Sequence, residues 1–191
     1  LLSAYDIRTK SMQAIELRAG DALIYAARKE EDGQIVSVSA SGLAIRYPIA
    51  EIAATGRTAA GVRGMQLAEC DEVVFAEQIG EEGELLLVSD RGYAKRTLAV
   101  DYEAQARAGK GVKTFSFNKN GSNGTRVAAA FHVTNPEDFE IVLKDGERTR
   151  MSTESILIEP RASKGQPCVM ALLANTVDHL IRAAKIEGGL Q

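Results

Sequence analysis

The stretch GYAKRTLAVDYEAQARAGKGVK, residues 92–113, decides the fold because the chain repeats it. A close echo starts 50 residues earlier at Gly42, and a weaker one starts 54 residues later at Gly146. A recurrence at this spacing is typical of propeller blades, each of which is one small sheet. We therefore predict an all-β, propeller-like fold with blades of about four strands, in three complete repeats and a partial one.

Each repeat has short β-favouring runs on both sides of a glycine turn, which predicts a hairpin. Further short runs complete the sheet. The predicted strands are 35–38, 43–48, 62–67 and 72–78, then 84–89, 93–98, 112–117 and 125–133, then 139–143, 147–151, 169–173 and 177–183. The predicted units are the second half of a truncated blade (1–33), two blades (34–80 and 81–135), a divergent last blade (136–185) and a tail (186–191). Because the chain begins inside this pattern, we expect it to be a piece of a longer protein.

The composition is that of an ordinary globular protein. The 191 residues are 45% apolar and 26% charged, and the apolar runs are far shorter than the roughly 20 residues of a membrane helix. With no signal-peptide pattern, the expected location is the cytoplasm, with no membrane partner. Cys70 and Cys168 lack CxxC or histidine spacing, so we predict buried thiols and no metal site.

Charge is unevenly distributed along the chain, although the formal net charge is only −3. Residues 69–84 contain seven acids and no base, whereas residues 91–113 contain six bases and two acids. Repeats could gather the basic stretches on one rim, although solvated loops would give the same alternation.

Three positions recur in register. A hairpin arginine occurs at Arg46, Arg96 and Arg150, a loop arginine at Arg57, Arg107 and Arg161, and a glycine at Gly61, Gly111 and Gly165. Glycines of this kind let backbone amides approach a phosphate. Taken singly, the glycines suit strand turns and the arginines suit solvated surfaces. Recurring together at blade spacing, they predict a row of cations for a curved polyanion.

Two segments carry a family resemblance. GYAKRTLAVDYEAQARAGKGVK and GLAIRYPIAEIAATGRTAAGVRGMQL resemble blades in the C-terminal domain of the bacterial type IIA topoisomerase A subunits, those of DNA gyrase and topoisomerase IV. The resemblance implies a β-pinwheel, a disc whose blades exchange strands and whose basic rim binds and bends duplex DNA. It also implies two protein partners at the bacterial nucleoid, the ATPase B subunit of the enzyme and the remainder of the A subunit.

The resemblance further implies that the catalytic tyrosine, the metal-binding acids and the ATPase lie outside this segment. We therefore expect no catalytic residue and no cofactor here, whereas the parent enzyme would need ATP and Mg²⁺ for strand passage and decatenation. A gyrase signature loop reads QRRGG, then Lys or Arg, then Gly. Residues 105–111 match it except at Ala106 and Ala108, and GRTAAGVRGMQL and the divergent last blade favour topoisomerase IV.

The candidate DNA contacts are the basic residues of the hairpins and connections. They are Arg46, Arg57, Arg63, Lys95, Arg96, Arg107, Lys110, Lys113, Arg150, Arg161 and Lys164, with loop glycines Gly61, Gly109, Gly111 and Gly165. A protein-interaction propeller is the alternative, and it should show an apolar or mixed pocket near the axis. An enzyme is the least supported class, because His132 and His179 are isolated in the sequence.

Overall fold

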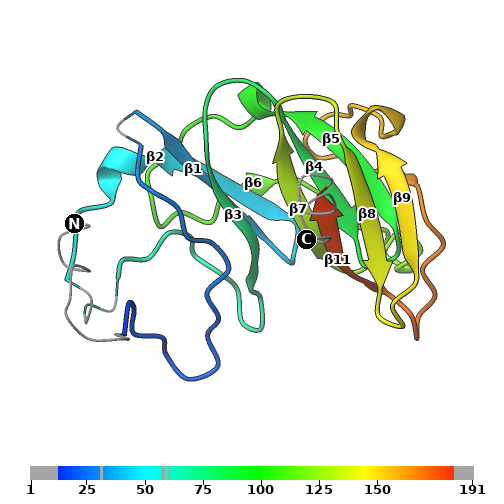
Figure 1. The fold of residues 1–191 in the computed structure, drawn as a ribbon, viewed down its shortest axis with the longest axis horizontal. Coiled ribbons are helices and arrows are strands. Elements are labelled where there is room, and N and C mark those ends of the chain that lie inside the picture. The colour runs from blue at the N-terminus through cyan, green and yellow to red at the C-terminus, as the bar shows by residue number, and fades with distance from the viewer. Residues whose placement is uncertain (1–12, 31, 57–58, 60, 183–191) are drawn as a thin grey trace, which may run out of the picture.

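A computed structural model describes residues 13–30, 32–56, 59 and 61–182. Its regular structure is β apart from three short 3₁₀ turns, η2 (Ile49–Glu51), η3 (Ala99–Asp101) and η4 (Thr153–Ser155). Three antiparallel sheets follow one another along the molecule, coloured from cyan through green to yellow and red in Figure 1. This arrangement confirms the predicted all-β, propeller-like fold.

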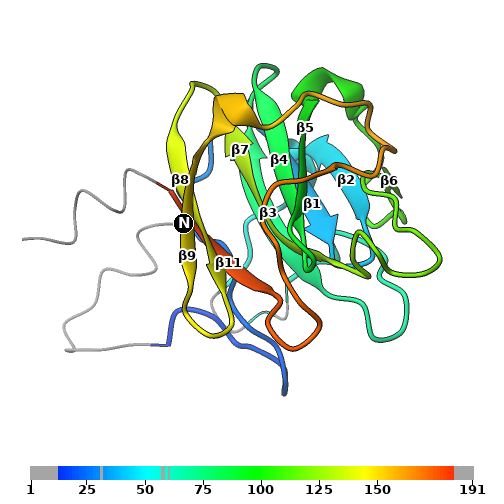
Figure 2. The same cartoon turned by 90° about the vertical axis from the view of Figure 1, so that its right-hand side faces the viewer.

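The first sheet has the strand order β3-β1-β2-β6, with β1 (Gln34–Ser39), β2 (Leu43–Pro48), β3 (Val73–Ile79) and β6 (Val112–Lys113). The second has the order β10-β5-β4-β7, with β4 (Glu84–Ser89), β5 (Tyr93–Leu98), β7 (Val127–Val133) and β10 (Gln166–Pro167). The third has the order β11-β8-β9, with β8 (Asp138–Leu143), β9 (Arg148–Ser152) and β11 (Val177–Arg182). Figure 2 shows the three sheets from the side of the third.

The fourth strand of a sheet comes from the following repeat. β6 pairs with β2, with Ala44 opposite Val112, and β10 pairs with β5, with Ala94 opposite Gln166. We name residues 111–115 and 165–169 the exchange segments, and residues 61–65 are their equivalent in the first repeat. The expectation that each blade supplies all four of its own strands is wrong, and strand exchange agrees with the resemblance.

Each exchange segment pairs over only two residues. Both Thr114 and Phe115 donate their backbone N–H to the carbonyl of Gly42, so the segment curls around the hairpin turn and leaves the ladder. Three connections, the loops 55–61, 105–111 and 160–165, lead into these segments. Ser116 donates its backbone N–H to the carbonyl of Ser163 in the third connection. The predicted strands 62–67 and 169–173 are therefore not formed, and 112–117 is shortened to β6. Residues 13–30 and 32–33, the described part of the predicted half blade, contain no strand.

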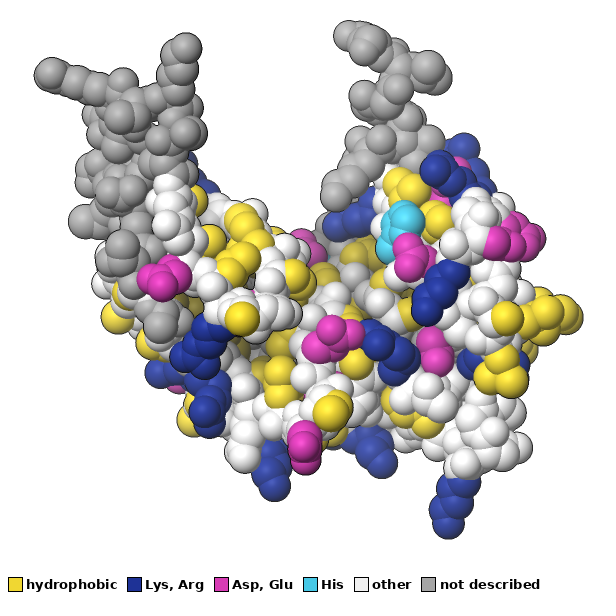
Figure 3. Space-filling model, turned by 90° about the horizontal axis from the view of Figure 1, so that it is seen from below, with side chains coloured by type: hydrophobic (Ala, Val, Ile, Leu, Met, Phe, Trp, Pro, Cys, Tyr) yellow, Lys and Arg dark blue, Asp and Glu magenta, His cyan; other side chains and the backbone are white. Residues whose placement is uncertain are grey.

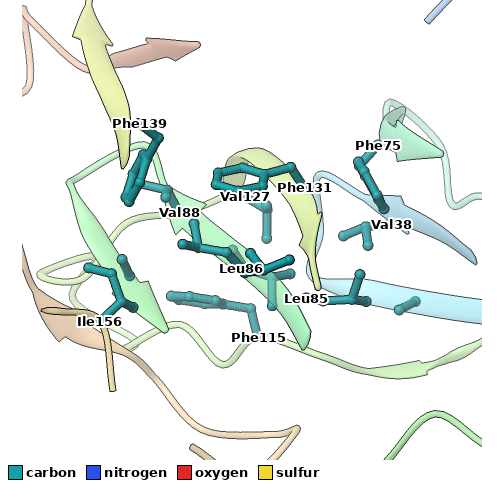
Figure 4. Packing of buried hydrophobic residues seen from close by; sticks show 14 of the residues in the cluster. Val38, Phe75, Leu85, Leu86, Val88, Phe115, Val127, Phe131, Phe139 and Ile156 are labelled. Carbon is teal, nitrogen blue, oxygen red and sulfur yellow. The ribbon is translucent and has the colours of Figure 1, made fainter. Parts of the chain in front are cut away.

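The core is continuous from sheet to sheet. All four apolar residues from Leu85 to Val88 on β4 are fully buried, because β4 is central in the middle sheet. Phe115 of an exchange segment inserts beneath this strand, and Phe131 packs edge-on against Phe139 of the third sheet (Figure 4). Since β7 contacts both β3 and β11, neighbouring sheets supply one another's apolar surface.

Candidate nucleic-acid interface

The glycines of the exchange segments are packed against backbone rather than held open for a ligand. Gly111 has φ +78°, and a Cβ built there would lie 2.4 Å from the carbonyl oxygen of Ala44. Gly165 has φ +69°, and its Cβ would lie 2.9 Å from the carbonyl oxygen of Ala94. Only glycine accepts this conformation and this closeness, so these two residues permit strand exchange. A Cβ at Gly61, by contrast, would meet nothing within 4 Å, and Gly109 has only ordinary contacts.

Arg46 is buried and fully engaged within the protein. Its side chain is 3% exposed and pairs with Glu81 at 2.9 Å. Nε donates to the side chain of Gln34, and the terminal nitrogens donate to the carbonyls of Ala99, Tyr102 and Gly80. The prediction that Arg46 faces a ligand is therefore corrected, because its guanidinium would have to leave all these partners to reach a phosphate.

Arg96 holds the equivalent place in the second repeat. It is 15% exposed, pairs with Glu84 at 2.7 Å, and donates from Nε to the carbonyl of Ile156. Arg150 of the third repeat pairs with Asp138 at 3.0 Å but is 61% exposed. The hairpin arginine thus binds the repeat that follows, and only Arg150 presents most of its surface.

Lys95 is fully buried, which corrects its assignment to a surface contact. Its Nζ donates to the carbonyls of Pro160 and Arg161 and to the Ser163 hydroxyl. Burial lowers the pKa of the Lys95 amine to about 8, partly offset by the nearby carboxylate of Glu159. The amine therefore fixes the third connection against the second hairpin.

The loop arginines join one connection to the next. Arg107 donates to the carbonyl of Arg63, and Arg161 donates in the same way to the carbonyl of Lys113. Both side chains are half-buried. Arg57, the equivalent in the first repeat, lies outside the described residues. These contacts hold the exchange segments in place, and each uses one terminal nitrogen of the guanidinium.

Four predicted cations are exposed on or beside the exchange segments and their equivalent. They are Arg63, Lys110, Lys113 and Lys164. Lys110 and Lys164 directly precede Gly111 and Gly165. β6 and β10 are the outermost strands of their sheets, whereas the β3 edge packs on the neighbouring sheet, so these segments form an outer edge. Figure 3 shows one face of the molecule, where Lys and Arg side chains alternate with acids.

Metal-ligating clusters, membrane helices, histidines and surface depressions give weaker indications of function in the described part of the chain. No cluster of three potential metal-ligating side chains is found there, and no helix in it is long and apolar enough to cross a membrane. His132 is buried against the carbonyl of Glu82, while His179 contacts Asp178 at the surface. An open depression of about 400 Å³ lies beside the third connection, lined by residues that include Tyr93, Cys168 and Met170.

The two thiols differ, which corrects one prediction. Cys70 is exposed rather than buried and has φ +60°. Cys168 is half-buried, its Sγ donates to the carbonyl of Gly92, and burial raises the pKa of its thiol to about 11.

Sequence reasoning missed the acceptors of the hairpin arginines, although the signal was present. Gln34, Glu84 and Asp138 each stand 12 residues before their arginine, at the same shifts of 50 and 54 residues as the hairpins. Each accepts a hydrogen bond from that arginine across the hairpin. A recurring polar residue on the strand beside a recurring cation, diagonal to it in the hairpin register, indicated an internal pair.

Each exchange segment adds a strand to the sheet of the preceding repeat, and consecutive sheets joined in this way define a propeller-like domain of repeated blades. A family model described as DNA gyrase C-terminal domain, beta-propeller, matches residues 33–79 and 83–123. The gyrase A protein of Kosmotoga olearia is 44% identical over 62 residues, which are 31% of this chain and 8% of that protein.

Solved structures agree on the fold. The C-terminal domain of DNA topoisomerase IV superposes with a TM-score of 0.87 at 20% identity, over 100% of this chain and 62% of that one. The DNA gyrase A C-terminal domain gives 0.78 at 22% identity, over 88% and 57%, and the E. coli ParC C-terminal domain gives 0.65 at 16%, over 93% and 71%. The chain thus spans less than two thirds of the first two structures.

The family match over residues 33–79 and 83–123 and the fold of the chain both agree with a C-terminal β-propeller domain of the bacterial type IIA topoisomerase A subunits. The sequence resemblance to this family, and the β-pinwheel that it implied, are confirmed.

Proposed function

We propose that this chain binds duplex DNA by its phosphate backbone and bends it along the outer edge of the disc. The observation that carries the proposal is the placement of Lys110, Lys113 and Lys164, exposed at the outer edges of two successive sheets. The match to this topoisomerase family over residues 33–79 and 83–123 supports the same ligand. Such contacts would be independent of sequence, because phosphates carry no base information.

A rigid series of sheets suits this task. Bending a duplex over tens of base pairs costs on the order of 1 to 6 kcal/mol, which cations held at fixed spacing offset through phosphate contacts. The arginines and Lys95 that join the repeats supply the rigidity. Arg46, Lys95 and Arg96 therefore act on DNA binding through the fold, whereas Lys110, Lys113, Lys164 and Arg63 are the proposed contacts.

The test is the binding of the chain to a duplex of about 40 base pairs across a salt series, followed by fluorescence anisotropy. In the variant K110E/K113E/K164E we expect weaker binding and a salt slope shallower by about one for each phosphate that is no longer bound. The matched control R18E/K29E/K144E changes net charge equally at exposed cations outside the exchange segments and the loops bonded to them. Equal weakening by both variants, or none by the first, would refute the outer-edge interface.

Within the family, we propose that the chain comes from topoisomerase IV, with gyrase as the alternative. The departures at Ala106 and Ala108 from the gyrase loop support topoisomerase IV, as does full coverage of this chain by the topoisomerase IV fold. The gyrase relative and the family model's description favour the alternative. Ligation of a nicked circle on the protein discriminates, since a wrapping domain changes the linking number and a domain that only bends DNA does not.

In this proposal the chain guides DNA for an enzyme whose chemistry lies elsewhere. Strand passage and decatenation would use the ATPase B subunit together with the remainder of the A subunit, with ATP and Mg²⁺, in the bacterial cytoplasm.

A protein-interaction role is the second candidate, and one observation favours it. Met170, Leu172 and Leu173 are 83%, 60% and 85% exposed beside the depression at the third connection. If this patch binds an apolar peptide instead, M170E should abolish that binding without changing DNA affinity.

A further inference from the structure

The stretch that follows the exchange segment is longer in the second repeat than in the other two. Eleven residues, 116–126, lie between the exchange segment and β7. The equivalent stretches, residues 66–72 and 170–176, have seven each. The first and third repeats thus reach their next strand without the additional residues. The second repeat uses them to form a loop, residues 118–124.

Loop 118–124 is held in one conformation by its own hydrogen bonds. Asn118 donates its backbone N–H to the side chain of Asn123 at 2.7 Å, and its side chain donates to the Ser122 hydroxyl at 2.8 Å. Ser122 in turn donates its backbone N–H to the side chain of Asn120 at 3.1 Å. A loop that is ordered in advance loses little conformational entropy when it binds a ligand.

The side chain of Asn123 joins this loop to the third connection. It is fully buried, and its Nδ2 donates to the carbonyl of Ser116 at 2.8 Å and to the carbonyl of Lys164 at 3.0 Å. Both amide hydrogens and the amide oxygen therefore have partners. Because a buried carbonyl left without its donor is costly, these bonds fix the loop and the backbone of Lys164 relative to one another.

Charge distinguishes the loop from the two equivalent stretches. Residues 66–72 carry three acids and no base, and residues 170–176 carry no charge, whereas residues 116–126 carry two bases and no acid. One of these bases, Arg126, forms an ion pair with an acid of the first repeat. The other, Lys119, is exposed, and its side chain forms no hydrogen bond or ion pair with another described residue. The ordered loop thus presents one cation that is free to bind an anion.

We propose that Lys119 binds a DNA phosphate next to the one bound by Lys164, and that Asn123 positions both lysines. The assignment depends on the proposed function and adds to it a cation outside the exchange segments. Asn123 is a positioning residue, because its buried amide reaches only protein atoms. Two cations fixed to one buried amide keep a constant separation, which suits the regular spacing of phosphates along a duplex.

The salt dependence of duplex binding tests the new contact in the variant K119A. Loss of one phosphate contact makes the slope of log affinity against log salt shallower by about 0.9. The advantage of wild type over K119A should therefore shrink about three- to fourfold between roughly 50 and 200 mM salt. K144A is the matched control, because Lys144 is also exposed but lies in the turn of the third hairpin. It should bind DNA as wild type does.

A double-mutant cycle tests the positioning role of Asn123. The variant N123A releases the loop and the backbone of Lys164 together, so its salt slope should be shallower than that of K119A. In K119A/N123A, loss of the lysine should then change the slope less than it does in the wild-type background. A purely structural role of the amide would leave the two effects on the slope additive.

Lysine acetylation followed by mass spectrometry tests the contact on the wild-type chain and needs no variant. A bound duplex should protect Lys119 and Lys164 and leave Lys144 reactive. Protection of Lys119, with a shallower slope in K119A and non-additive effects of N123A, would support the proposal. A slope in K119A equal to that in K144A, or an unprotected Lys119, would overturn it and leave the outer-edge interface standing. A wild-type chain that binds no duplex would overturn both.

Discussion

The Nε of Arg96 donates to the backbone carbonyl of Ile156 at 2.8 Å, and this bond ties the second hairpin to the third repeat. Arg46 does the same to the second repeat from a more buried site. We expect R46A to lower the free energy of unfolding by about 3 kcal/mol or more and R96A by about 2, because charged hydrogen bonds are removed and buried carbonyls stay unpaired. Urea denaturation measures both.

The matched control for these variants is R150A. Arg150 forms an exposed pair with Asp138, and such pairs contribute about 0 to 1 kcal/mol. Equal losses of stability in all three variants would show that the hairpin arginines do not join repeats.

The pH dependence of stability should carry a contribution from Lys95. Its pKa is about 8 in the fold and about 10.4 in an unfolded chain, so the unfolded state binds more protons between these values. The contribution of Lys95 to the free energy of unfolding therefore rises as the pH increases from about 8 to 10.4, by up to about 3 kcal/mol. Denaturant titrations of wild type and K95M across this range should diverge by that amount. A constant difference between them would show that the amine is not desolvated.

Glycine substitutions should separate strain from collision. Gly61 and Gly111 share a positive φ, so alanine strains the backbone by about 1 kcal/mol at either position. Only at Gly111 does the new Cβ also meet the Ala44 carbonyl, at 2.4 Å, which should cost about 1–3 kcal/mol more. Thermal unfolding at low protein concentration compares G111A with G61A. Equal effects would contradict the packing of the exchange segment on β2.

The two cysteines should react at very different rates. With Ellman's reagent at pH 8, Cys70 should react promptly, while Cys168, with its thiol pKa near 11, should react about 100-fold more slowly until urea is added. The C70S variant should lose the fast phase alone. A fast phase that persists in C70S would place Cys168 at the surface.

The sequence predicted the hairpins well because their signals are local. Runs such as residues 84–89 and 93–98 flank a turn glycine, and they reappear as β4 and β5 with the predicted bounds. The third strand of each repeat was overestimated. Residues 62–67 have a β-favouring pattern, but pairing depends on a hairpin in another repeat, which no local window contains.

The candidate contacts were harder to predict for the same reason. Arg46, Arg96 and Arg150 occupy one position of the repeat, yet their side chains are 3%, 15% and 61% exposed. What covers an arginine is the next repeat, not its own sequence neighbours. Lys110 and Lys164, which precede a left-handed glycine at an outer edge, stay exposed in both repeats.

The exposure of Arg150 also bears on how an array of such repeats can change in length. A blade added after the third would need no new surface on its neighbour, since the guanidinium, the β9 edge and the open turn at Gly146 are already in place. The added blade would convert Arg150 from a solvated cation into an internal tie and present its own arginine in turn. Duplication of one repeat thus yields a compatible interface at once, which makes blade number an easily varied property of this architecture.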